Sequence, residues 1–171
     1  MPTRYIALLR AVNVGGTGNL AMADLARLCS DAGFTKAKTY IASGNVVFES
    51  RASAATVKSK LEQNLLAHSG KPVGVLIRTA EQIAAVLTAN PFRNKAAKHT
   101  VAIFLDDAPP ADTLDNAVGR KDEEIRLGQR EIYVHYPSGM GRSKLRIPAA
   151  KAGTARNMNT NAKLAEMAGD L

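Results

Sequence analysis

Three short segments of this chain combine glycines, amide side chains and guanidinium groups, which are groups that proteins use to bind anions. They cover residues 8–16 (Leu-Leu-Arg-Ala-Val-Asn-Val-Gly-Gly), 39–45 (Thr-Tyr-Ile-Ala-Ser-Gly-Asn) and 154–160 (Thr-Ala-Arg-Asn-Met-Asn-Thr). Each lies at or near the edge of an apolar run. None has a spacing that fixes one chemistry, so we treat them as candidate ligand-binding segments without an assigned reaction.

The candidate ligand-binding residues come from these motifs and from a fourth segment, Gly-Arg-Ser-Lys at residues 141–144. They are Arg10, Asn13, Gly15, Gly16, Tyr40, Ser43, Asn45, Arg142, Lys144, Arg156, Asn157 and Asn159. Thr154 is a plausible helix N-cap, which predicts that Arg156 lies in the first helical turn. Because the helix dipole favours acidic residues there, an incoming anion such as phosphate would supply the missing negative charge.

Each motif also has a structural interpretation. Residues 16–21 fit G-x-G-x-x-G/A, but a dinucleotide site needs a parallel second strand that ends in an acidic residue. Here the next strand turns back as a hairpin, so a tight backbone turn explains the glycines better. Ser43, Gly44 and Asn45 are ordinary turn formers, and Tyr40 is equally typical of a partly buried structural tyrosine.

Other catalytic arrangements are scarce. The histidines lack metal-ligand spacing, no serine lies in a G-x-S-x-G setting, and the acidic residues 106–107 and 122–124 are typical of solvated turns. Cys29 shares an apolar helical face with Leu25, and a lone cysteine excludes an internal disulfide. We therefore expect no metal, identify no cofactor and leave open whether the protein is an enzyme.

Positive charge is concentrated in one segment. The 171 residues carry a formal net charge of +8. Residues 138–165 hold six basic residues and no acidic one, so the rest of the chain has 17 basic against 15 acidic residues. Such a segment favours nucleic acid or another polyanion as a partner, and a solvated basic tail is the alternative.

The composition predicts a globular protein of the cytoplasm. Hydrophobic residues make up 46% of the chain, enough for a core. No apolar run approaches the roughly 20 residues needed to span a bilayer. The apolar stretch at residues 5–14 contains Arg10 and Asn13 and lacks the layout of a secretory signal.

The first part of the chain predicts the element order β-α-β-β-α-β, complete by residue 78. Strands are expected at residues 4–12, 38–42, 46–49 and 73–78, with helices at 22–32 and from Val57 to Gly70. This is the split βαβ arrangement of ferredoxin-like folds. We therefore expect an α+β fold with a ferredoxin-like subdomain at residues 1–78.

A second, smaller α+β subdomain is expected at residues 99–171. Thr79 and Gln82 form a capping box that starts a connecting helix, and Asn90-Pro91-Phe92 ends it within the 79–98 connection. The order β-α-β-β-α follows, with a short helix bearing Leu114 and Val118 and a terminal helix from Thr154.

Taken together, these motifs resemble a widespread bacterial family, domain of unknown function 1697. The shared segments are Leu8 to Gly16, Thr39 to Phe48, Asn90 to Phe92, Gly141 to Lys144 and Thr154 to Thr160. Members generally carry tryptophan where this chain has Met158. The resemblance implies an α+β fold with two related subdomains and implies no activity.

Three functional hypotheses follow, with the oligomeric state left open. The leading one is binding of a phosphate-bearing partner, above all nucleic acid, through the basic segment and the amide-rich loops. The alternative is an enzyme that acts on a small phosphorylated or otherwise anionic metabolite in a cleft between the subdomains. In the third, the motifs are purely structural and join the two subdomains through hydrogen bonds that pair buried polar groups.

Overall fold

The computed structural model describes residues 1–13 and 19–171. By the proximity of Cα atoms, the described chain forms two compact units. Unit 1 comprises Met1–Ala84 and Lys163–Leu171, and unit 2 comprises Ala85–Ala162. The end of the chain groups with unit 1, where Arg4 donates hydrogen bonds to the carbonyls of Gly169 and Leu171 (2.9 and 2.7 Å). These bounds differ from the sequence-based boundaries at residues 78 and 98.

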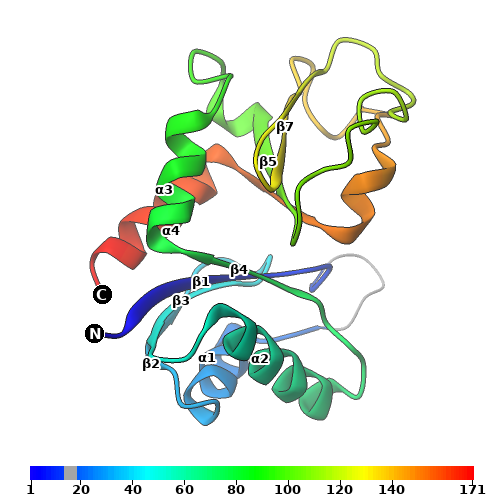
Figure 1. The fold of residues 1–171 in the computed structure, drawn as a ribbon. Helices are drawn as coiled ribbons and strands as arrows, with labels where there is room; N and C mark the ends of the chain where they lie inside the picture. Colours follow the sequence, from blue (N-terminus) through cyan, green and yellow to red (C-terminus); the bar gives the residue numbers. More distant parts are fainter. Residues whose placement is uncertain (14–18) are drawn as a thin grey trace. The chain divides into compact units, whose positions relative to one another are not determined.

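Unit 1 has the predicted βαββαβ order. Its elements are β1 (Thr3–Leu9), α1 (Met22–Asp31), β2 (Thr35–Thr39), β3 (Asn45–Ser50), α2 (Ala54–Ser69) and β4 (Val75–Thr79). The strands form one antiparallel sheet in the order β2-β3-β1-β4. Both α1 and α2 lie on one face of this sheet (Figure 1). This is the ferredoxin-like arrangement, as predicted.

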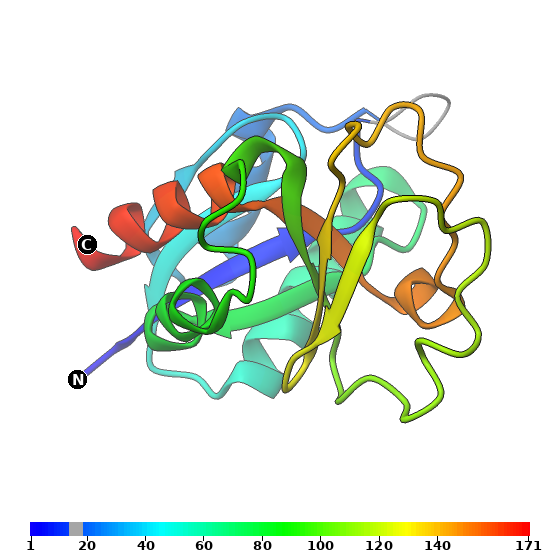
Figure 2. The ribbon, with the colours of Figure 1, turned by 90° about the horizontal axis from the view of Figure 1, so that it is seen from above.

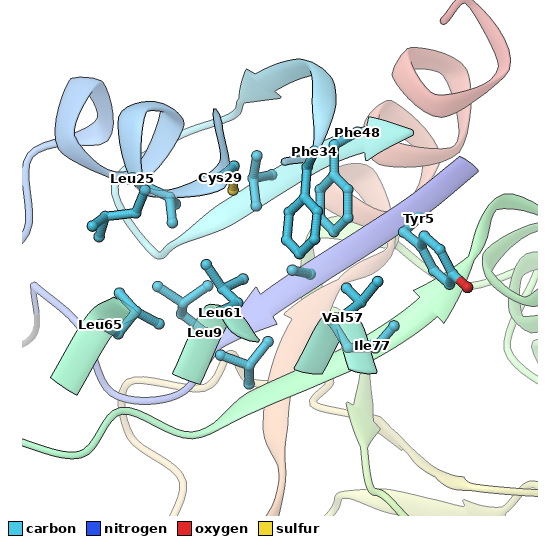
Figure 3. Close-up of a cluster of buried hydrophobic side chains, with 14 of the residues drawn as sticks. Tyr5, Leu9, Leu25, Cys29, Phe34, Phe48, Val57, Leu61, Leu65 and Ile77 are labelled. Carbon is cyan, nitrogen blue, oxygen red and sulfur yellow. The ribbon is translucent and has the colours of Figure 1, made fainter. Parts of the chain in front are cut away.

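The core of unit 1 follows from the alternation of side chains along its strands. Tyr5 and Leu9 of β1 belong to the buried cluster between the sheet and the two helices, in which Leu9 lies beside Leu61 of α2 and Tyr5 near Val57 (Figure 3). The ring of Phe34 stacks on that of Phe48 from β3 with centroids 4.4 Å apart. The intervening residue Leu8 is also fully buried, so β1 is covered on both faces.

Unit 2 contains a second sheet. The elements after β4 are α3 (Ala80–Ala89), the short 3₁₀ helix η1 (Ala97–His99), β5 (Thr100–Phe104), β6 (Glu124–Leu127), β7 (Glu131–His135), the 3₁₀ helix η2 (Pro148–Ala152), β8 (Thr154–Asn157) and α4 (Met158–Gly169). Strands pair antiparallel in the order β6-β7-β5-β8. Apolar side chains of β5 and β7, such as Ile103 and Val134, pack with Ile147 in its core. Two four-stranded antiparallel sheets with helices make this an α+β fold, as expected.

The signals around α3 are confirmed. Thr79 Oγ accepts from the Gln82 amide at 3.2 Å, and the Gln82 side chain accepts from the Thr79 amide at 2.8 Å. After the helix, the Asn90 side chain accepts from the Phe92 amide at 2.9 Å, which turns the chain. The capping box and the Asn-Pro-Phe break therefore act as their residue types predict.

The helix expected at Leu114 and Val118 does not form. The connection between β5 and β6 runs as turns and loop (Figure 2). Both apolar side chains are exposed, so they have no core to face. Val118 instead forms an isolated antiparallel bridge with Arg146, with paired backbone hydrogen bonds of 2.9 and 2.8 Å.

The prediction that the terminal helix starts at Thr154 is also wrong. Residues 154–157 form β8, which pairs with β5, and α4 begins at Met158. The N-cap role falls to Asn157, whose side-chain oxygen accepts from the Thr160 amide at 2.9 Å. Among the described residues, no helix is long and apolar enough to cross a membrane.

Candidate functional site

The first motif turns sharply at the end of β1. Asn13 adopts a positive φ of 55°. Its side chain donates to the carbonyls of Leu20 and Ala42, both at 2.8 Å, and accepts from the Leu20 amide at 2.7 Å. The amide group therefore joins three backbone groups of unit 1, which supports the structural interpretation of this residue. Gly15 and Gly16 lie outside the described residues.

The second motif has a similar internal arrangement. Asn45 is fully buried and donates to the Tyr40 carbonyl at 2.8 Å and to the Ser43 hydroxyl at 2.9 Å. The backbone of Tyr40 donates to the Asn45 carbonyl at 2.9 Å, so the turn closes on itself. Tyr40 and Ser43 are both half-buried, and the side-chain amide of Asn45 forms hydrogen bonds within the turn.

These two turns contact each other in unit 1. The Leu9 amide donates to the Gly44 carbonyl at 2.9 Å. A Cβ on Gly44, whose φ is +91°, would lie 2.6 Å from a methyl carbon of Val12, so no larger residue fits there. Ala11 and Ile41 also have positive φ, of 52° and 49°. Close packing and side-chain hydrogen bonds therefore hold a strained backbone in place.

The third motif is mostly buried in unit 2. Arg156 is 6% exposed and donates to the Thr154 hydroxyl at 2.6 Å and the Ala155 carbonyl at 3.0 Å. Burial lowers the pKa of Arg156 to about 10, so the guanidinium stays charged at neutral pH. Asn157 caps α4, and the adjacent Asn159 is exposed. The conflict between Arg156 and the helix dipole is absent, because this residue belongs to β8.

The fourth segment contributes to a concave site. We call this site the basic pocket; its volume is about 370 Å³. All of its described lining residues belong to unit 2. They are Gly119, Lys121, Asp122, Glu123, Ser138, Gly139, Arg142, Ser143 and Lys144.

Two loops that are distant in sequence form the basic pocket. The Val118–Arg146 bridge brings them together, and Gly119 packs beside it against the backbone of Lys144. A Cβ on Gly119, whose φ is +74°, would lie 2.1 Å from the Lys144 carbonyl oxygen. Only glycine permits this close approach and this φ.

Serine hydroxyls satisfy the carboxylates of the basic pocket. Ser138 donates to Asp122 at 2.5 Å, and Ser143 donates to Glu123. Glu123 also accepts from the Lys121 amide at 2.6 Å. The hydrogen bond from Ser143, then that from the Lys121 amide, lowers the pKa of Glu123 below its usual value of 4.5. Donors of the two loops thus stabilise the ionised form of Glu123.

The cations of the basic pocket lack such partners. Lys121, Arg142 and Lys144 are exposed. None of these three side chains forms an ion pair or hydrogen bond with another described residue. A concave site with several cations of this kind concentrates positive potential and favours an anion.

The predicted site residues thus fall in different units and line different pockets. Arg10, Asn13, Tyr40, Ser43 and Asn45 belong to unit 1, and Arg10 lines a different pocket of about 620 Å³. Arg142 and Lys144 line the basic pocket, while Arg156, Asn157 and Asn159 of unit 2 are not among its lining residues.

Sequence reasoning missed Lys121, Ser138 and Glu123 as parts of one site. The basic pocket depends on the Val118–Arg146 pairing, for which the sequence has no local signal. Among residues 1–13 and 19–171, no group of three or more histidine, cysteine or acidic side chains could hold a metal ion. Cys29 is buried, and burial raises the pKa of its thiol to about 12, which makes it unreactive.

The fold and these motifs define an α+β protein with two four-stranded antiparallel sheets. The chain belongs to the family described as "Protein of unknown function (DUF1697)", whose model matches residues 2–133. The expected family is thereby confirmed.

Among solved structures, the chain is similar to a conserved bacterial protein from Streptococcus pneumoniae. The two sequences are 27% identical, and the match covers 98% of this chain and 99% of the other with a TM-score of 0.81. The comparison with curated proteins gave no match. Neither the description of the family nor that of this relative states an activity.

Proposed function

We propose that the protein binds a phosphate-bearing ligand in the basic pocket. The observation that carries this proposal is the lining of one concave site by Lys121, Arg142 and Lys144, none of them in an ion pair with a described residue. A phosphate group carries up to two negative charges and several acceptor oxygens, and the bidentate guanidinium of Arg142 suits it.

Shape favours a small ligand. A volume of about 370 Å³ lies at the lower end of the range of small-molecule sites, roughly 300–1,000 Å³. Asp122 and Glu123 also line the pocket and accept hydrogen bonds from Ser138 and Ser143, and the three cations outnumber these two carboxylates among its described lining residues. The pocket therefore fits one phosphate or diphosphate group better than a long polymer backbone.

Calorimetric titration with inorganic pyrophosphate at low salt tests this proposal. Replacing two of the three pocket cations (Arg142→Gln with Lys144→Gln) should weaken binding by roughly tenfold or more, because two charge-assisted contacts are lost. The matched control replaces the exposed Arg93 and Lys95 of unit 2 by glutamine and should leave binding unchanged. Undetectable binding to the wild type, or equal losses in both double variants, would reject the proposal.

Nucleic acid is the second candidate. Residues 138–165 contain six basic and no acidic residues, and Arg142, Lys144, Arg146 and Lys151 are exposed. Arg156 does not add to such a surface, because it is buried. A polymer would contact cations beyond the pocket, so its affinity should depend on Arg146 and Lys151 as well.

Fluorescence anisotropy with labelled single-stranded DNA and RNA at low and moderate salt separates the two candidates. If nucleic acid is the partner, replacing Arg146 and Lys151 by glutamine should weaken binding and reduce its salt dependence. If the ligand is small, this variant should bind pyrophosphate as the wild type does. No binding of either polymer at micromolar protein and low salt would exclude nucleic acid.

A further inference from the structure

A second pocket, in unit 1, has a different chemical character. We call it the Arg10 pocket; its volume is about 620 Å³. Its lining comes from the turn after β1, the residues before α1 and the end of α2 with the loop that follows. It shares no residue with the basic pocket, so it is a separate site.

Part of the wall of the Arg10 pocket is apolar. Val12, Leu20 and Leu65 are buried members of the unit 1 core whose side chains border the pocket. These side chains are at most 8% exposed, so the apolar surface open to a ligand comes from Ala11, Pro72 and the partly buried Val73. A ligand in this pocket would extend the core of unit 1, so an apolar body would gain free energy by leaving water.

The charged groups of the Arg10 pocket are all basic. Arg10, His68 and Lys71 line it, and no aspartate or glutamate is among its described lining residues. His68 lies near Asp24, with 3.8 Å between the imidazole Nε2 and the carboxylate, but Asp24 belongs to α1 and does not line the pocket. The pocket therefore combines an apolar wall with positive charge.

Local structure positions two of these cations. The Arg10 amide donates to the Gly74 carbonyl at 2.9 Å. The side chain of Arg10 packs over Gly74, because a Cβ on this glycine would lie 3.0 Å from Cδ of Arg10. Gly70 ends α2 in the left-handed conformation with φ of 74°. The loop then places Lys71 beside the last turn of α2, where Ser69 Oγ donates to the Lys71 carbonyl at 3.0 Å.

We infer that the Arg10 pocket binds a small organic acid, with its apolar body against Ala11, Pro72 and Val73 and its carboxylate at Arg10 and Lys71. A purely apolar ligand would bring no charged group to these cations, and an inorganic anion would leave Ala11, Pro72 and Val73 in water. The Arg10 pocket thus favours a ligand that has an apolar body and a negative charge in one molecule. The basic pocket has a polar lining and does not favour an apolar body.

Three probes and four proteins test this inference by calorimetry and by amide chemical shifts. The probes are octanoate (apolar body and carboxylate), octanol (apolar body alone) and inorganic phosphate (charge alone). The proteins are the wild type, Arg10→Gln, Lys71→Gln and the control Lys60→Gln, which removes the same charge from an exposed position of α2 outside the pocket. Thermal unfolding of each variant checks that it is folded.

Octanoate should bind the wild type, shift amides at residues 10–12 and 65–73, and bind roughly tenfold more weakly to Arg10→Gln and Lys71→Gln. The Lys60→Gln protein should match the wild type, and octanol and phosphate should leave these amides unshifted. Three results would each overturn the inference: no octanoate binding at millimolar concentration, equal affinity for octanol, or equal affinity of the pocket variants and the control. These results do not depend on the basic pocket, because its cations are unchanged in every protein.

Discussion

The turns of unit 1 and the basic pocket of unit 2 are both built from glycines and polar side chains, yet they use them in opposite ways. In unit 1 the Asn13 amide forms three hydrogen bonds to backbone groups, and the buried Asn45 amide forms two within its turn. In the basic pocket the carboxylates are satisfied by serines, while the cations of Lys121, Arg142 and Lys144 have no ion-pair partner among the described residues. Polar motifs of similar composition can therefore serve the fold in one place and a ligand in another.

The largest effect is expected where the fold of the basic pocket depends on one glycine. Gly119→Ala places a Cβ 2.1 Å from the Lys144 carbonyl oxygen at a positive φ. We expect the free energy of unfolding to fall by about 3 kcal/mol or more, together with a loss of pyrophosphate binding. Gly139→Ala is the control, since Gly139 has a similar φ of +84° and nothing within 4 Å of its Cβ. Urea unfolding should show a loss of only about 1 kcal/mol for it, and equal losses would contradict this account.

Asn13→Ala tests the other side of the comparison. It removes three hydrogen bonds and leaves the Leu20 amide and two carbonyls without this partner. We expect unit 1 to lose about 2–3 kcal/mol in urea unfolding. Pyrophosphate binding by the folded variant should equal that of the wild type. A stable variant that no longer binds pyrophosphate would reverse the roles of the two regions.

Asn157→Ala tests the position at which α4 begins. Because Asn157 accepts from the Thr160 amide, its loss should cost about 1 kcal/mol of unfolding free energy. The neighbouring Asn159 is exposed and has no such role in the cap, so Asn159→Ala should change stability little. Thermal unfolding of the two variants gives the comparison. If Asn159→Ala were the more damaging change, Asn157 would not be the cap.

Glu123→Gln gives the smallest effect, and that effect depends on pH. The pKa of Glu123 is lowered in the folded protein, so the unfolded state binds the proton more readily. The stability that this carboxylate contributes is present above its usual pKa of 4.5 and is lost as the pH falls through the folded value. The difference in unfolding free energy between wild type and variant should therefore shrink between about pH 7 and about pH 3. A difference that stays constant or grows in acid would contradict the hydrogen-bond arrangement at Glu123.

The fold of unit 1 could be predicted because its signals are local. The continuous apolar run of β1, the turn at Gly44 and the αL end of α2 at Gly70 are all visible in the sequence. The last strand, β8, was hidden because its sequence, Thr-Ala-Arg-Asn, is polar and resembles a helix start. Tertiary burial of Arg156 outweighs that local preference.

The candidate site could be predicted only in part, because it also depends on contacts between segments that are distant in sequence. Arg142 and Lys144 stand out in sequence because no acidic residue surrounds them. Lys121 and Ser138 do not, since they reach the site through the long-range pairing of Val118 with Arg146. Partner relationships such as that of Asn13 with Ala42 also appear only when the chain has folded.

The central claim is that the cations of the basic pocket bind a phosphate group while the polar turns of unit 1 serve the fold. An amide chemical-shift titration with inorganic pyrophosphate tests it most directly, because one experiment reports on both regions. We predict saturable shifts at residues 119–123 and 138–144 and unchanged amides at residues 10–13 and 40–45. Shifts confined to residues 10–13 and 40–45, or no saturable shift at either place, would contradict it.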